Sequence, residues 1–316
     1  MHDPDPSADA ATLREVAAGV HAWIQPDGTW WVNNAGAVTG DAGTLIIDTC
    51  ATATRTRRFL EAVASTSGDA PIRFAANTHE HGDHTYGNWL LPAGTTLLGH
   101  PNMRAGLAVD PVIEACPPVW EPVPDWEAPE RRLPDVTVEA GATVHLGDRI
   151  VELHHPGHPA HTTGDLVAWV PDERVLFTGD LIFAGLTPLV MAGSIEGARH
   201  ALEWIAGFEP SVLVPGHGPV VPADLLPAVL AEHERYYLFI AELADRVRQS
   251  GHTILEVANG ADLGPFAEWA DAERLVLNLH RAVAEDGGPA FDVLAAFADA
   301  ITFNGGPLTT HVCCTS

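Results

Sequence analysis

The sequence predicts an α/β protein, and three observations support that prediction. Short apolar segments of strand length alternate with amphipathic segments of helix length over residues 16–222. Several of the short apolar segments run directly into metal-ligand side chains, which is where α/β proteins tend to place their chemistry. The chain has 316 residues, 46% of them hydrophobic, which is enough for a large core.

A β-hairpin is expected to open the fold. Residues 16–25 read as a strand, residues 26–28 (Pro-Asp-Gly) as a turn, and residues 29–38 as the returning strand. Trp30 and Trp31 lie on this second strand, where they either pack or line the mouth of a substrate pocket.

Further strands and helices follow. The apolar run 44–48 predicts a buried strand, and residues 52–67 suit a helix with Phe59 and Val63 on one face. The other expected elements are a helix at 194–207 and strands at 72–77, 95–99, 143–146, 149–154, 166–170, 174–178 and 211–215. Between them, residues 111–134 contain too many prolines for a helix, so we expect an irregular insertion that is either a lid or a wrapped loop.

After Pro222 the sequence predicts mainly helices. Apolar residues recur at helical spacing over residues 226–247, with Gly251 as the expected C-cap, and again over 266–283 and 291–301. We therefore divide the chain into a catalytic domain, residues 1–222, and a helical C-terminal extension packed on it, residues 223–316.

Charge and composition exclude several classes of function. The chain carries 42 acidic and 16 basic residues, a formal net charge of −26, which would repel nucleic acid and anionic lipid surfaces. It has no secretory signal at its start and no run of about 18 apolar residues. Four cysteines do not make a disulfide framework, and Cys313 and Cys314 either bind metal or lie on a frayed tail. We expect a cytoplasmic protein that binds neither nucleic acid nor membrane.

One loop concentrates metal-ligand side chains. Residues 77–88 contain the order His-x-His-x-Asp-His, formed by His79, His81, Asp83 and His84. Imidazole nitrogens and carboxylate oxygens suit zinc, iron or manganese. Gly82 permits a sharp turn, so that His79 and His81 can point to one position and Asp83 and His84 to a second position nearby.

Three other segments end apolar strands with ligand-type residues beside small ones. They are Pro159–Asp165, which contains His161, then Phe177–Asp180, which ends in Asp180, and Pro215–Gly218, which contains His217. The small residues permit the backbone to approach a metal centre closely.

These motifs, in this order over residues 16–222, resemble those of the metallo-β-lactamase superfamily of metal-dependent hydrolases. The resemblance is to branches with a full two-metal site, such as glyoxalase II (hydroxyacylglutathione hydrolase), lactonases and thioesterases. It implies a four-layer αββα sandwich, two mixed sheets packed face to face with helices outside, here followed by the helical C-terminal extension. Asp180 stands where β-lactamases of the family often carry Cys, which favours the hydrolase branches named above.

The resemblance also implies a ligand set. His79, His81 and His161 would hold one metal ion, Asp83, His84 and His217 would hold a second, and Asp180 would bridge the two. His161 is preferred to His154, His155 and His158 because it begins a His-Thr-x-Gly run before a strand, and His158 is its main rival. Asp48 and Asp165 are either carboxylates that support the ligands or ordinary turn residues.

The predicted function follows from this ligand set. Two divalent ions, zinc in the first place and iron or manganese as alternatives, would share a hydroxide that attacks a thioester, ester or lactone, with Asp83 orienting the water or accepting its proton. The expected partner is a small-molecule acyl substrate, and the helical extension is expected either to shape the pocket or to form a homodimer contact. Two other functions remain open: hydrolysis of β-lactams, and a di-iron redox centre.

Overall fold

The computed structural model describes residues 11–25, 27–68, 70–285 and 287–312. Cys313 and Cys314, which the sequence left as metal ligands or part of a frayed tail, lie outside these ranges.

The N-terminal half of the chain forms the first sheet. Its strand order is β1-β2-β3-β4-β5-β6-β8, antiparallel from β1 to β4 and parallel from β4 onward. The strands are β1 (Thr12–Ala17), β2 (Val20–Ile24), β3 (Ala35–Gly40), β4 (Gly43–Ile47), β5 (Ile72–Ala76), β6 (Thr96–Gly99) and β8 (Val136–Thr137). The helices of this half are α1 (Ala53–Thr66), α2 (Gly82–Thr85), the 3-10 turn η1 (Asn88–Leu90) and α3 (Pro101–Val109).

The second sheet has the order β14-β13-β12-β11-β10-β9. Its strands are β9 (Gly141–His145), β10 (Ile150–His154), β11 (Val167–Val170), β12 (Val175–Phe183), β13 (Val212–His217) and β14 (Val221–Pro222). β12 and β13 run parallel, joined through helix α4 (Ile195–Ala206), and the other neighbours are antiparallel.

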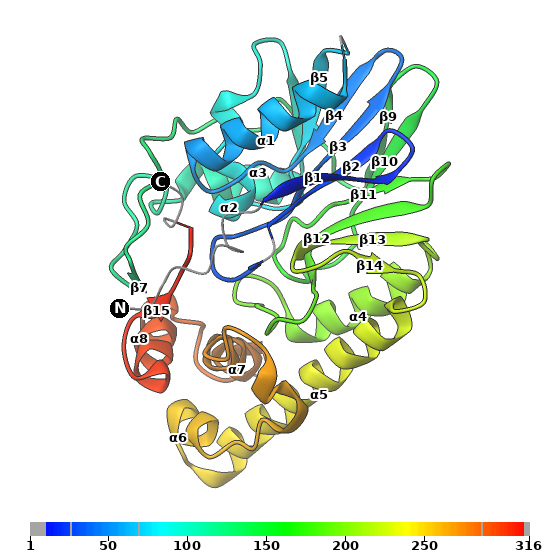
Figure 1. Cartoon of the computed structure of the whole chain (residues 1–316). Coiled ribbons are helices and arrows are strands. Elements are labelled where there is room, and N and C mark those ends of the chain that lie inside the picture. The colour runs from blue at the N-terminus through cyan, green and yellow to red at the C-terminus, as the bar shows by residue number, and fades with distance from the viewer. Residues whose placement is uncertain (1–10, 26, 69, 286, 313–316) are drawn as a thin grey trace.

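Alternation along the strands explains why the two sheets stack. In β4, Leu45 and Ile47 face the core between the sheets, together with Phe177 of β12, whereas Ile46 faces the opposite side. Ile46 packs there with Phe59 of α1, while α4 and the later helices cover the outer face of the second sheet (Figure 1). The predicted four-layer αββα arrangement is confirmed.

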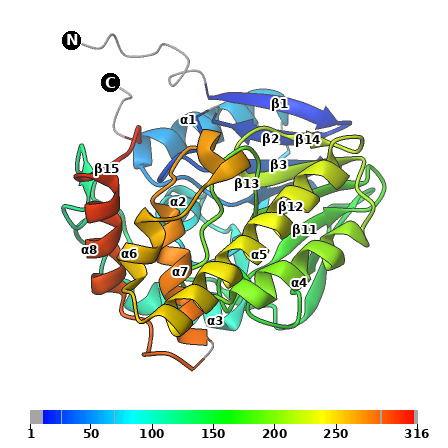
Figure 2. The same ribbon diagram turned by 90° about the horizontal axis from the view of Figure 1, so that it is seen from below.

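The chain after β14 is mainly helical, as predicted. It forms α5 (Leu226–Ser250), α6 (Ile254–Asn259), the 3-10 turn η2 (Gly264–Glu268), α7 (Arg274–Glu285) and α8 (Val293–Asn304). Gly251 caps α5 in the left-handed conformation, with φ of 74°, which confirms its predicted role. Helix α5 lies between α4 and α7 (Figure 2). The division of the chain at Pro222 stays a prediction.

The last described residues return to the insertion predicted at 111–134. Strand β15 (Leu308–Thr309) pairs in parallel with β7 (Trp120–Glu121), which lies inside the insertion. Apart from β7, the insertion has little regular structure. Within the ranges given above, none of the helices is both long enough and apolar enough to cross a bilayer.

Three local predictions were wrong. Residues 16–25 contain the end of β1 and all of β2, because the chain already reverses at Gly19, with φ of 65°. Trp30 and Trp31 lie in the connection between β2 and β3 and not on a strand. Strand β12 does not end at Thr178 but continues to Phe183, with irregular pairing at Gly179, so that Asp180 lies inside it. Helix α3 had not been predicted.

The close approach of the two sheets gives a stability test. A Cβ added at Gly36 of β3 would lie 2.2 Å from the ring of Phe177, whereas one at Gly306 would meet nothing within 4 Å. We expect Gly36→Ala to lower the free energy of unfolding by about 1–3 kcal/mol through overpacking, and Gly306→Ala to leave it nearly unchanged. Urea denaturation at a fixed metal concentration measures both, and equal effects of the two changes would contradict this packing.

Candidate metal centre

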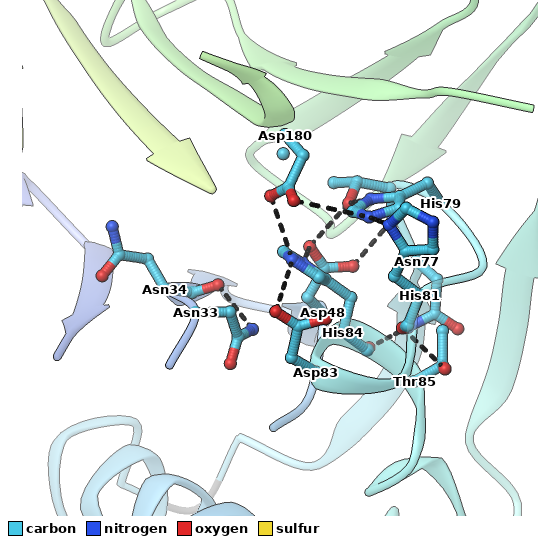
Figure 3. Close-up of polar contacts among 12 residues, drawn as sticks. Asn33, Asn34, Asp48, Asn77, His79, His81, Asp83, His84, Thr85 and Asp180 are labelled. Atoms are coloured by element: carbon cyan, nitrogen blue, oxygen red, sulfur yellow. Dashed lines mark hydrogen bonds and ion pairs between the residues drawn. The ribbon is translucent and has the colours of Figure 1, made fainter. Parts of the chain in front are cut away.

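The seven predicted ligand residues come from four segments that meet at one edge of the two sheets. His79 and His81 lie in the loop after β5, and Asp83 and His84 lie in the short helix α2 that this loop leads into. The other three come from the second half of the catalytic region: His161 from the loop between β10 and β11, Asp180 from β12, and His217 from the end of β13. Residues 79–84, in this loop and in α2, are called the α2 loop below. Figure 3 shows Asp180, which comes from the opposite sheet, facing these residues.

The seven side chains form two groups, each able to hold a metal ion. Ligand atoms of His79, His81, His161 and Asp180 lie within 4.8 Å of one another, and so do those of Asp83, His84 and His217. Asp180 reaches both groups: its Oδ2 lies 3.5 Å from His161 Nε2 and 3.4 Å from His217 Nε2, and its Oδ1 lies 3.0 Å from His84 Nε2. The structure thus brings the seven predicted residues together in two groups, and their division between two metal ions stays a prediction.

The donor atoms converge on the centre, and two of them have no hydrogen-bond partner among the described residues. His81 Nδ1 lies 3.1 Å from His79 Nε2 and 2.9 Å from His161 Nε2, so three ring nitrogens converge on one point. His84 Nε2 and Asp180 Oδ1 are buried without a hydrogen-bond partner among the described residues, although they face each other. Buried polar atoms are rarely left unpaired, and a cation between them resolves the deficit. The nitrogen and oxygen donors suit zinc, iron or manganese.

The two groups differ in electrostatics. Burial lowers the pKa of His79 well below its usual value, with a further decrease from His84, and burial lowers the pKa of His161 to about 3. Burial also opposes charge on His84 and His217, but the Asp180 and Asp83 carboxylates outweigh it and raise the pKa of His217 to about 9. The imidazoles of the first group are thus held neutral, whereas the carboxylates of Asp83 and Asp180 favour positive charge at the two histidines of the second group.

Hydrogen bonds behind the rings fix which nitrogen faces the centre. His161 Nδ1 donates to the Leu189 carbonyl at 2.6 Å, and His217 Nδ1 donates to the Gly28 carbonyl at 2.8 Å. Both rings therefore present Nε2 to the centre.

Asp48 orients two of the other ligands. It accepts from His84 Nδ1 at 2.8 Å and from the Thr78 backbone N–H at 2.7 Å. The Thr78 hydroxyl donates to the same carboxylate and so accepts from His79 Nδ1 at 3.0 Å. Asp48 itself has a left-handed backbone, with φ of 59°, which aims its side chain under the α2 loop. Of the two candidate carboxylates, Asp48 and Asp165, it is therefore Asp48 that contacts the ligand histidines.

Asp165 and the other histidines have different places. Asp165 accepts from the backbone and hydroxyl of Thr162, so it shapes the His161 loop without touching a ligand ring. His158, the expected rival of His161, is partly buried and bonds locally to the Pro159 carbonyl. Neither His154, which pairs with Glu152, nor His155, which stacks on His100, belongs to the two groups.

A cavity of about 340 Å³ opens beside the centre. His81, Asp83, Asp180 and His217 form its metal side, and most other walls are apolar. Those walls include Trp30, Trp31, Phe183, Leu189, Met191, Pro111 and Val112. The two tryptophans thus line the pocket, and the insertion contributes its first two residues to the wall.

Aromatic contacts fix the insertion against this wall. The Trp126 indole donates to the Val112 carbonyl at 2.8 Å, and its ring lies 4.6 Å from that of Trp31.

Three cavity residues, Tyr86, Arg274 and Glu80, were not predicted to line the cavity, because no local sequence pattern marks them.

The chain is similar to several known proteins. A family model described as the metallo-beta-lactamase superfamily matches residues 28–217. The chain is 26% identical over 189 residues to the 2,4-dinitroanisole O-demethylase subunit alpha of Nocardioides sp. (strain JS1661), which covers 57% of this chain and 51% of that protein. It is 30% identical over 131 residues to a hydroxyacylglutathione hydrolase of Methylococcus capsulatus, covering 40% of each. It is 28% identical over 120 residues to the acyl-coenzyme A thioesterase MBLAC2 of Bos taurus, covering 35% and 42%. The chain therefore spans about half, or less, of the length of these curated relatives.

A solved structure supports the fold. The metallo-beta-lactamase from Pontibacter korlensis aligns with a TM-score of 0.55 and 20% identity, over 71% of this chain and 99% of that one. An identity this low shows the fold alone. The family model, however, covers more than half of the chain and includes all seven residues of the two groups, so the chain belongs to the metallo-beta-lactamase superfamily.

Proposed function

We propose that this protein is a dinuclear metal-dependent hydrolase that cleaves a thioester, an ester or a lactone. The observation that carries the proposal is the position of Asp180, whose carboxylate lies within 3.5 Å of rings from both groups at the wall of an apolar cavity. In this proposal His79, His81 and His161 hold one ion, Asp83, His84 and His217 hold the other, and Asp180 bridges them. Two divalent ions, zinc in the first place, would polarise the scissile carbonyl and supply a nucleophilic hydroxide at neutral pH.

Residues of the chain supply the rest of the chemistry. Asp83 is 7% exposed, lines the cavity and lies 3.2 Å from His217 Nε2, so its carboxylate can accept the proton of the attacking water. The apolar walls exclude bulk water and strengthen the electrostatic interactions inside the cavity. The cavity volume favours a compact acyl group, and relatives named hydroxyacylglutathione hydrolase and acyl-coenzyme A thioesterase support the thioester class.

The first test compares substrate classes. Purified protein is expected to hydrolyse small acyl thioesters or lactones with a higher kcat/KM than nitrocefin, because Asp180 gives an oxygen-rich centre in a pocket sized for a compact acyl group. Spectrophotometric assays of thiol release, lactone opening and nitrocefin cleavage, run side by side, provide the comparison. Faster cleavage of nitrocefin would identify a β-lactamase instead.

The second test removes the metal. Dialysis against a chelator is expected to reduce hydrolysis to background, because the nucleophile depends on the ions, and zinc is expected to restore it. The metal content of protein purified without added metal distinguishes the redox alternative. Stoichiometric iron with a visible absorption band would favour that alternative over hydrolysis.

The third test concerns Asp48. Replacing it by Asn keeps the size of the side chain but weakens the charge-assisted bond to His84 Nδ1. We expect Asp48→Asn to lower metal affinity by about 10–100-fold, measured by competition with a chromogenic chelator. The exposed turn residue Asp172 serves as the matched control, and Asp172→Asn should bind metal like the parent protein. Equal affinities in both variants would show that Asp48 does not position the ligands.

A further inference from the structure

The cavity beside the metal centre contains one guanidinium group. Among the cavity-lining residues of the described chain, Arg274 is the single arginine or lysine, and it is 1% exposed. The other charged lining residues, apart from the histidines, are acidic: Glu80, Asp83, Asp110 and Asp180. An anionic group entering the cavity away from the metals would therefore find one attractive side chain and several repulsive ones.

Packing holds the guanidinium in a fixed orientation close to the centre. Its Cζ lies 4.5 Å from the ring centroid of Trp30 and 5.2 Å from that of Phe183. Phe183 in turn stacks on His217, with ring centroids 5.1 Å apart and planes inclined by 9°. Arg274 is thus separated from the metal centre by one aromatic ring, although it comes from helix α7, far along the chain.

The contacts of Arg274 use its two terminal nitrogens but not Nε. Nη1 donates to the Thr187 carbonyl at 3.0 Å, and Nη2 lies 2.7 Å from an oxygen of Asp271. The Nε–H is buried and has no hydrogen-bond partner among the described residues. An unpaired N–H on a buried cation costs free energy until an acceptor reaches it. The indole Nε1 of Trp31, on the wall of the same cavity, is likewise buried without a partner in the described chain.

We propose that Arg274 is a specificity residue that binds a carboxylate of the substrate. A carboxylate suits the free Nε–H because charge-assisted hydrogen bonds are roughly twice as strong as neutral ones. The substrate class is then a compact thioester or ester whose acyl group ends in a second, free carboxylate, held at Arg274 while the scissile carbonyl lies at the metal centre. This inference rests on the hydrolase function proposed above.

The test uses two thioesters of the same shape. One is the S-methyl thioester of succinic acid, with a free carboxylate, and the other is the S-methyl thioester of succinamic acid, with a carboxamide in its place. The parent protein is expected to prefer the carboxylate substrate by at least about tenfold in kcat/KM. In Arg274→Met the ratio should fall to near one, mainly through a higher KM for the carboxylate substrate. A parent protein without preference, or a ratio that Arg274→Met leaves unchanged, would overturn the inference.

Controls separate recognition from packing. Arg55 is another buried arginine, 3% exposed, but it does not line the cavity. Arg55→Met should therefore retain the substrate ratio, even where it lowers stability. If Arg274→Met does not fold, Arg274→Lys supplies the test, because it keeps the charge but lacks the planar fork. A lower ratio in the lysine variant supports recognition, and an unchanged ratio overturns it.

Binding measurements distinguish failure of this inference from failure of the proposed function. Calorimetry compares succinate, which has two carboxylates, with succinamate, which has one, on the metal-loaded parent protein and on Arg274→Met. We expect the parent to bind succinate more tightly and the variant to lose that preference. If no thioester, ester or lactone is cleaved but this difference persists, the hydrolase proposal fails and the carboxylate site stands. If thioesters are cleaved and the two proteins bind the probes alike, the carboxylate site fails alone.

Discussion

The arrangement of the centre depends on one carboxylate, that of Asp180, between two sets of ring nitrogens. It can lie there because the surrounding backbone lacks side chains. A Cβ on Gly216 would lie 2.0 Å from Asp180 Oδ1, and one on Gly179 would lie 2.5 Å from the Thr78 hydroxyl. Gly179 also has φ of 50°, which disrupts the pairing of β12 with β13 and turns Asp180 toward the α2 loop. These small residues are therefore required, because larger side chains would clash where the two sheets meet at the centre.

The pocket, in contrast, is assembled from distant parts of the chain. Trp30 comes from the β2–β3 connection, Val112 from the insertion and Arg274 from helix α7. The last described strand ties these parts together: β15 pairs with β7 of the insertion, and the Thr310 hydroxyl donates to the Trp30 carbonyl at 2.7 Å. The helical region is thus part of the cavity wall as well as an outer layer. Its Glu273 accepts from the Trp30 indole at 2.6 Å, which couples the position of α7 to the aromatic wall.

Sequence reasoning succeeded where the signal was local and failed where it was not. The apolar run of β4 predicted a buried strand because its alternate residues serve two cores, and the ligands of the α2 loop could be recognised because four of them lie within six residues. The end of β12 was misplaced because a glycine inside a strand looks like a strand end. Arg274 was missed because its contacts with Trp30 and Phe183 join positions far apart in the chain, which no periodic pattern records. The orientation of the His81 ring is likewise set by tertiary structure: its Nδ1 faces the other rings, whereas His79 and His161 present Nε2.

The two groups are proposed to hold two metal ions bridged by Asp180. Elemental analysis of protein saturated with zinc and freed of excess metal tests it most directly, with Asp180→Ala measured in parallel. We expect two ions per chain in the parent protein and fewer in a folded Asp180→Ala variant, because the bridging carboxylate would contribute to both positions. One ion per chain in the parent, or full occupancy in a folded variant that lacks the carboxylate, would contradict it.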